Sequence, residues 1–160
     1  MKLYHLTREA HLDNISEHGL LPTVGENVAT TFGIPVVWLS ANKRPGWNLS
    51  YHADHVILTV EPSRKRLAHW RTWFVSLEAE QNGTIYRGRE ALASLDKDER
   101  CRASMQDSHA YYVYFGVIPP SRIKRVDNVQ WCAEDQETET LLRKHQEALG
   151  GFTHSETIGA

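Results

Sequence analysis

The 160-residue chain has few cysteines and no long apolar run, and these absences exclude several classes of protein. Its two cysteines, Cys101 and Cys132, form neither a disulfide framework nor a metal-ligand spacing, which favours a reducing compartment. No apolar segment approaches the length of a membrane span, and the N-terminus lacks a signal-peptide pattern. We therefore expect a cytoplasmic protein that does not bind a membrane.

The sequence also lacks a charge excess and the short motifs of many enzymes. A formal net charge of -2 gives no overall basic field for nucleic acid, although it leaves room for a local basic cleft. There is no nucleophile elbow, no phosphate-binding glycine loop, no dinucleotide fingerprint and no zinc signature. His52 and His55 resemble a metal-binding pair only weakly, so we expect no metal site.

Residue patterns predict strands and helices without a regular alternation, which indicates an α+β fold. Strands are expected over 2–5, 36–40, 55–60 and 110–118, with 123–129 as a continuation of the last. Helices are expected over 8–18, 66–81, 89–105 and 134–149. In the first helix, Thr7 is the expected N-cap and Gly19 the C-terminal stop. We expect one domain over 1–150 and a flexible tail over 151–160, with no internal repeat.

Polar residues at the ends of expected strands are the best candidates for a binding site. His5 and Thr7 lie two positions apart, so both side chains point to one side of an extended strand. Ser40 ends the second strand. An imidazole and hydroxyls suit the hydroxyl groups of a sugar. The alternative is a half-buried histidine followed by a helix cap.

Aromatic and basic residues complete this candidate site. Trp47 and Tyr51 lie in a segment without strand or helix periodicity, and we expect them to stack on a planar ring. The run Tyr111-Tyr112-Val113-Tyr114-Phe115 alternates between two faces, so at most one or two of its tyrosines can reach a site. Three cations are candidates for a phosphate group, although such side chains are usually solvated: Lys43, Arg44 and Arg71.

Taken together, these segments resemble the ADP-ribosyltransferase superfamily. The quoted segments are Leu-Tyr-His-x-Thr at 3–7, a helix ending in Gly-Leu at 19–20, Val-Trp-Leu-Ser at 37–40 and Tyr-Tyr-Val-Tyr at 111–114. The likeness is to small bacterial and phage-associated members, and to relatives such as DNA-targeting ADP-ribosyltransferase toxins and RNA 2′-phosphotransferases. It implies a split, mixed or antiparallel sheet with flanking helices, and NAD as the substrate.

The resemblance also assigns roles to residues. By analogy, His5 and Thr7 hold the ribose of NAD, Ser40 ends the second strand of the site, and Trp47 or Tyr51 packs on nicotinamide. The family's late-strand glutamate falls at Ala110, which cannot bond a ribose hydroxyl or stabilise positive charge on the ribose. Asp107, upstream, is the alternative carboxylate, and His5, Asp107 and Ala110 are thus the candidate catalytic positions.

Three functions fit these observations. The chain either transfers ADP-ribose from NAD to a protein or nucleic acid, or hydrolyses NAD, as a glycosyltransferase-type enzyme. Alternatively, it is an inactive nucleotide-binding module, because the carboxylate is missing. The third possibility is a protein-interaction domain with a tryptophan-rich surface centred on Trp70 and Trp73.

Overall fold

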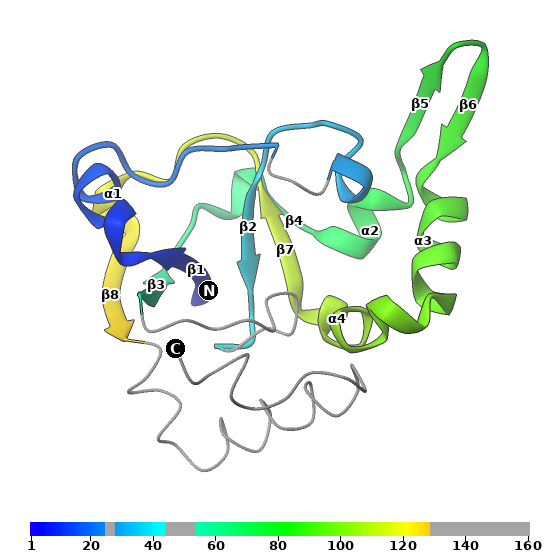
Figure 1. The fold of residues 1–160 in the computed structure, drawn as a ribbon. Coiled ribbons are helices and arrows are strands. Elements are labelled where there is room, and N and C mark those ends of the chain that lie inside the picture. The colour runs from blue at the N-terminus through cyan, green and yellow to red at the C-terminus, as the bar shows by residue number, and fades with distance from the viewer. Residues whose placement is uncertain (25–27, 44–53, 129–160) are drawn as a thin grey trace.

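A six-stranded antiparallel sheet organises the computed structural model of the chain, which describes residues 1–24, 28–43 and 54–128 (Figure 1). The strand order is β4-β7-β2-β1-β3-β8. The strands are β1 (Leu3–Arg8), β2 (Val37–Ser40), β3 (His55–Val60), β4 (Leu67–His69), β7 (Tyr111–Tyr114) and β8 (Ile123–Asn128). A separate two-stranded sheet pairs β5 (Glu78–Gln81) with β6 (Thr84–Arg87). The expected α+β class is confirmed. Of the two expected sheet types, mixed and antiparallel, the structure has the antiparallel one.

Short helices lie on both sides of this sheet. They are α1 (Leu12–His18), α2 (Trp70–Phe74), α3 (Gly88–Lys97) and α4 (Arg102–Asp107). The 3-10 turns are η1 (Glu9–His11), η2 (Val28–Thr30), η3 (Arg64–Arg66), η4 (Glu99–Cys101), η5 (Ser108–Ala110) and η6 (Pro120–Arg122). Figure 1 shows α1 beside β8 at one end of the molecule and α2 to α4 at the other, with the β5–β6 hairpin projecting from the body. Among the described helices, none is long and apolar enough to span a bilayer.

Each face of the sheet buries its own hydrophobic cluster. On one face, Leu3, Leu39 and Leu58 are buried together with Ile15 of α1. The opposite face buries a cluster that joins β7 to α2 and α3. At its centre Trp70 is only 1% exposed, its indole N–H donates to the carbonyl of Thr30 at 2.8 Å, and burial of such a ring stabilises the fold by about 1.5–3 kcal/mol.

The pairing of β1 with its two neighbours is unequal, and this inequality splits the sheet. β1 pairs with β3 at six positions, from Leu3–Val60 to Arg8–His55. It pairs with β2 only at Tyr4–Ser40. The two strands therefore separate beyond Tyr4, which leaves backbone groups on the facing edges without ladder partners. The expected split sheet is confirmed, and it places the strands around Leu3, Val37 and Val113 side by side.

Two expected boundaries around the first helix and the last strands are wrong. β1 continues through Thr7, which pairs with Val56, so Thr7 does not cap a helix. The segment 123–129 does not continue β7, because β8 lies beside β3 at the opposite edge of the sheet. β7 itself covers only the first part of the expected strand over 110–118.

The expected helix over 66–81 is also wrong, and the one over 89–105 is interrupted. The expected helix divides among β4, α2 and β5, because β4 pairs with β7 and the hairpin begins at Glu78. The second expected helix divides into α3, η4 and α4. The expected helix over 134–149 and the tail over 151–160 lie outside the described residues.

Candidate functional site

The split between β1 and β2 is occupied by the side chain of His5. Its Nδ1 lies 2.8 Å from the backbone carbonyl oxygen of Trp38 on β2. A carbonyl oxygen can only accept a hydrogen bond, so Nδ1 carries the proton and donates it. The imidazole thus fills a place that a ladder hydrogen bond would take if the two strands stayed paired.

This contact fixes the chemical character of the other ring nitrogen. With the proton on Nδ1, Nε2 of the neutral ring is an acceptor. Burial lowers the pKa of His5 below its ordinary value of 6.5, although the hydrogen bond to Trp38 acts in the opposite direction. His5 is therefore neutral at pH 7. Its Nε2 makes no hydrogen bond to any residue that the structure describes, so it is available to accept one from a ligand.

Thr7 lies on the same face of β1 as His5, as the sequence predicts. The register places His5 opposite Leu58 and Thr7 opposite Val56, two consecutive positions on one face of β3. Thr7 is half-buried, and its hydroxyl makes no hydrogen bond within the described part of the chain. An acceptor nitrogen and a hydroxyl group thus stand two residues apart on one strand.

Ser40 is not part of this pair. Its Cα partner across β1 is Tyr4, which faces the side opposite to His5 and Thr7. The Ser40 side chain is fully buried and its Oγ accepts a hydrogen bond from the backbone N–H of Asn42 at 2.9 Å. These contacts give Ser40 a role in the turn after β2.

The candidate carboxylate positions lie near the start of β7. Ala110 is the last residue of η5, and its carbonyl accepts from the N–H of Ala41 at 2.9 Å. β7 is two strands away from β1, which corresponds to about 10 Å across the sheet. Asp107 ends α4 and does not lie on a strand.

Two tyrosines of the aromatic strand, Tyr112 and Tyr114, lie on the face of His5, but only Tyr112 is partly exposed there. Tyr111 and Tyr114 are buried in the two opposite clusters. Tyr112 is half-buried and pairs with Leu39, which lies on the His5 face. Its ring meets His69 edge-on, with centroids 5.3 Å apart.

His69 is a residue of this face that the sequence analysis missed. Its Nε2–H donates to the carbonyl of His109 at 2.7 Å. Leu67 and His69 lie two positions apart, a spacing that places both on one face of a strand. The apolar stripe over 66–81 also fits a helix, and it concealed this signal.

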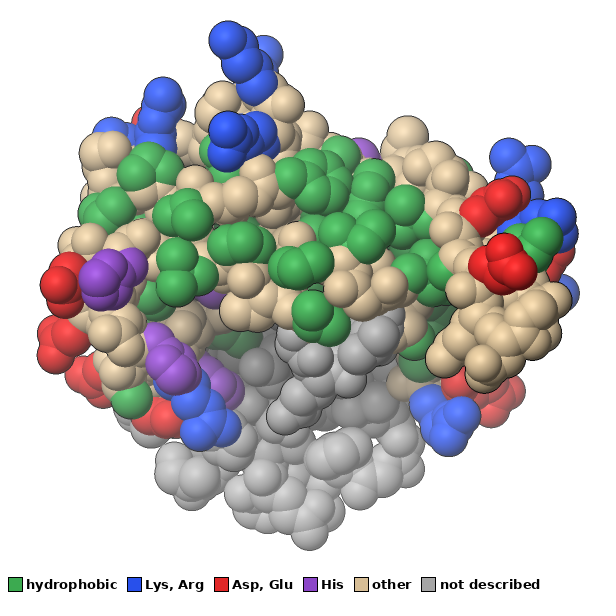
Figure 2. Space-filling model, turned by 90° about the horizontal axis from the view of Figure 1, so that it is seen from above, with side chains coloured by type: hydrophobic (Ala, Val, Ile, Leu, Met, Phe, Trp, Pro, Cys, Tyr) green, Lys and Arg blue, Asp and Glu red, His purple; other side chains and the backbone are tan. Residues whose placement is uncertain are grey.

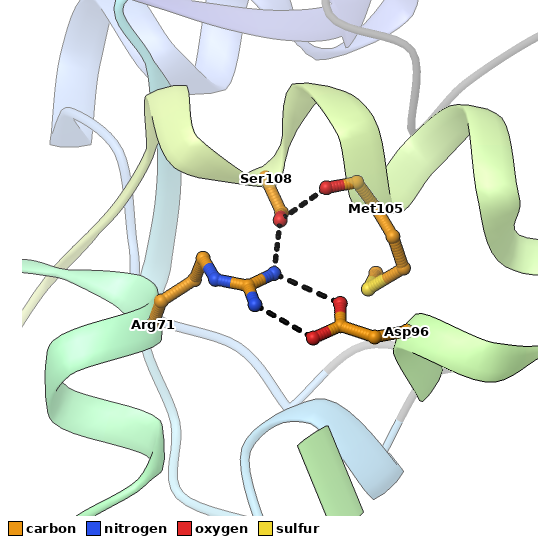
Figure 3. A network of polar contacts seen from close by, with 4 residues as sticks. All are labelled: Arg71, Asp96, Met105 and Ser108. Carbon is orange, nitrogen blue, oxygen red and sulfur yellow. Dashed lines mark hydrogen bonds and ion pairs between the residues drawn. The ribbon is translucent and has the colours of Figure 1, made fainter. Parts of the chain in front are cut away.

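Arg71 is not available for a phosphate group (Figure 3). Its guanidinium donates to both carboxylate oxygens of Asp96, at 3.0 and 2.7 Å, and to Oγ of Ser108 at 2.7 Å. Ser108 in turn donates to the carbonyl of Met105. The hydrogen bond from Arg71 lowers the pKa of Asp96. Arg71 thus connects α2 with α3 and η5.

Four further expected residues have other partners or lie outside the described part of the chain. Lys43 forms an ion pair with the buried carboxylate of Asp127, Nζ to Oδ2 at 2.9 Å, and Arg125 bonds the other oxygen at 2.8 Å. Trp47, Tyr51 and Arg44 lie outside the described residues. Within the described residues, no group of three or more His, Cys, Asp or Glu side chains is placed to hold a metal ion.

One solved structure from the comparisons resembles the fold. It is the DarTG protein of Thermosipho africanus in complex with ADP-ribose, at 13% sequence identity and a TM-score of 0.45. The alignment covers 98% of this chain and 49% of that chain, so this chain spans about half the length of the solved protein. No protein-family model matches the sequence, and no curated protein matches it either. A likeness of this strength assigns no role to any residue here.

Proposed function

We propose that the chain binds NAD or a related nucleotide at the split between β1 and β2, and acts as an ADP-ribosyltransferase-like enzyme. The reaction would transfer ADP-ribose to a macromolecule or hydrolyse NAD. The observation that carries this proposal is the hydrogen bond from His5 Nδ1 to the Trp38 carbonyl. It leaves a neutral imidazole with an acceptor at Nε2 beside the hydroxyl of Thr7.

These two groups are complementary to a ribose. Nε2 of His5 accepts a hydrogen bond from one sugar hydroxyl, and the Thr7 hydroxyl can donate to or accept from another. A protonated His5 would lose the acceptor, so the lowered pKa supports this assignment. The motif resemblance supplies the nucleotide, because the family's first-strand histidine and nearby hydroxyl hold the ribose of NAD.

The chemical step needs stabilisation of positive charge on the ribose. The bond between the ribose and nicotinamide breaks, nicotinamide leaves with the bonding electrons, and an acceptor or water attacks the ribose carbon. Ala110 offers no carboxylate for the charge that develops. This favours a second candidate, in which the chain binds the nucleotide without turning it over.

A tryptophan-rich interaction surface centred on Trp70 is not supported. Trp70 lies in the core and stacks on Phe74 with ring centroids 5.2 Å apart. Trp73 is half-buried and packs against Phe115. These tryptophans stabilise the packing of α2 on the sheet.

Ligand-induced stabilisation tests the binding proposal. NAD at a hundredfold excess over its dissociation constant should raise the free energy of unfolding by about 2.7 kcal/mol. His5→Ala should abolish most of this gain, because it removes the Nε2 acceptor, whereas His11→Ala, at an exposed position, should leave the gain intact. Thermal shifts with NAD, ADP-ribose and nicotinamide measure this, and equal shifts in both variants would refute the site.

Nicotinamide release separates the enzyme from the binding module. Release by the parent chain supports the transferase proposal, and Asp107→Ala then tests whether Asp107 supplies the carboxylate. If the parent binds NAD without releasing nicotinamide, Ala110→Glu should induce release, since one such electrostatic contact is commonly worth about a hundredfold. The absence of release from all three proteins would leave only the binding module.

A further inference from the structure

Two exposed surfaces have no role in the proposed site. Of the large hydrophobic side chains that the structure describes, seven are exposed. Two of these are Leu21, which follows α1, and Val117, which precedes η6; two others, Ile85 and Tyr86, are consecutive residues of β6 and point to opposite faces of the hairpin. Their exposed fractions range from 43% to 56%. Exposed apolar side chains that gather in groups are typical of interaction surfaces.

The first surface is formed by segments far apart in the sequence. Leu20 and Ile118 exchange two backbone hydrogen bonds, at 2.9 and 3.0 Å, so Leu21 and Val117 lie opposite each other. The Arg66 side chain lies beside Gly116, the residue that precedes Val117: a Cβ added at Gly116 would be 2.8 Å from Nη1 of Arg66. Figure 2 shows a band of hydrophobic side chains on this side of the molecule, with lysine and arginine side chains along its border.

Three consecutive cations of η3 give this surface its charge. Arg64, Lys65 and Arg66 are exposed, and none of them forms an ion pair within the described residues. By contrast, Arg71 and Arg87 are paired with carboxylates. We call Leu21, Val117, Arg64, Lys65 and Arg66 the basic–apolar patch. The three cations are neighbours without counter-charges among the described residues, so they repel one another. An anionic partner would relieve this repulsion.

The second surface is the β5–β6 hairpin. The register places Glu80 opposite Ile85, so one face of the hairpin presents a carboxylate beside an apolar side chain. Glu80 forms no ion pair among the described residues, whereas Glu78 bonds Arg87 at 3.3 Å nearer the base. The hairpin carries two glutamates and one arginine over 78–87, and it projects from the body in Figure 1.

We propose that the hairpin of one copy of this chain docks on the basic–apolar patch of a second copy. Glu80 then meets the cations of η3, and Ile85 packs against Val117 and Leu21. The two surfaces differ, so the contact is heterologous and each copy retains a free patch or a free hairpin unless the assembly closes into a ring. The apolar members of the patch, Leu21 and Val117, are aliphatic and cannot stack on nucleobases as aromatic side chains do, which favours a polypeptide over a nucleic acid.

Sedimentation equilibrium over a range of protein concentrations tests the proposal. The average mass should rise above the 18.3 kDa of one chain with increasing concentration, and fall again when salt is added. Glu80→Lys should weaken association about fivefold, as should Lys65→Glu. The matched controls are Lys97→Glu, an exposed cation of α3 that forms no ion pair with the described residues, and Val126→Ser, an exposed apolar side chain outside both surfaces.

Mixing the two charge variants provides the decisive measurement. The Glu80→Lys hairpin should dock on the Lys65→Glu patch, and the unaltered surfaces should dock on each other. Association in the mixture should therefore recover above that of either variant alone. A mass that stays at one chain at every concentration would overturn the proposal, as would equal losses in the control variants. Dissociation of the assembly by a single-stranded oligonucleotide that binds the patch more tightly would instead assign the patch to nucleic acid.

Discussion

At the scale of single residues, His5 connects the fold to the proposed chemistry. One nitrogen joins two strands that have separated, and the other makes no hydrogen bond to the described residues and is the proposed ligand contact. Burial disfavours the charged ring, and only the neutral ring has an acceptor at Nε2, so protonation should disturb stability and binding together.

This dual role predicts a pH dependence of stability. The folded-state pKa of His5 is lowered by burial, whereas the unfolded chain titrates near the ordinary value of 6.5. Below 6.5 the unfolded state binds a proton that the folded state excludes, so the free energy of unfolding should decrease as the pH falls, by up to about 1.4 kcal/mol per pH unit. This loss continues down to the folded-state pKa and is absent above 6.5.

Urea denaturation at pH values above and below 6.5 measures this dependence. His5→Gln should flatten it, because the amide can still donate to the Trp38 carbonyl but does not titrate. His11→Gln, at an exposed position, should retain the slope of the parent chain. The same slope in His5→Gln would show that other groups cause it.

Two glycines with similar backbone angles allow a second comparison at this scale. Gly19 and Gly83 have φ values of 80° and 78°, which side chains rarely adopt. A Cβ on Gly83 meets nothing within 4 Å, whereas one on Gly19 would lie 2.1 Å from the carbonyl oxygen of Ile118. Gly83→Ala should therefore cost about 1 kcal/mol from backbone strain, and Gly19→Ala should cost clearly more. Denaturation midpoints of the two variants test this, and equal losses would contradict it.

At the scale of elements, the sequence predicted the strands better than the helices. The β-branched run at 55–60 predicted β3, and the apolar run at 36–40 predicted β2. Both strands are buried, and short apolar runs of this kind are typical of buried strands. The helix over 66–81 was wrong because Leu67 lies on β4, the aromatic residues belong to α2 and the stretch ends in β5. Asn82-Gly83, a strong signal for a two-residue hairpin turn, lies directly after this stretch and was overlooked.

The candidate site was partly predictable for the same reason. Alternation along one strand is a local property, so His5 and Thr7 were correctly expected on one face. Whether Ser40 joins them depends on the register between β1 and β2, which is a long-range property that no local pattern encodes. The ion pair of Arg71 with Asp96 likewise depends on how α2 and α3 pack.

At the scale of the whole molecule, the β5–β6 hairpin stands apart from the two hydrophobic clusters. Its residues over 78–87 are exposed, except for the half-buried Ala79. At its base, the N–H of Gly88 donates to the carbonyl of Leu77 at 2.9 Å, so the two ends of the hairpin are already close together. A short glycine-serine linker can therefore replace the hairpin without stretching the chain.

Replacement of residues 78–87 by such a linker should leave the body of the protein folded. Little apolar surface is lost from the clusters, so the free energy of unfolding should change by less than about 1 kcal/mol. Circular dichroism and urea denaturation measure this, with Trp70→Ala as a control that should destabilise by about 3–5 kcal/mol. Because the proposed site lies on β1 and β2, nucleotide stabilisation should also persist. Failure to fold without the hairpin would show that the packing of α2 and α3 depends on it. The hairpin would then be part of the folded body and not a separate docking element.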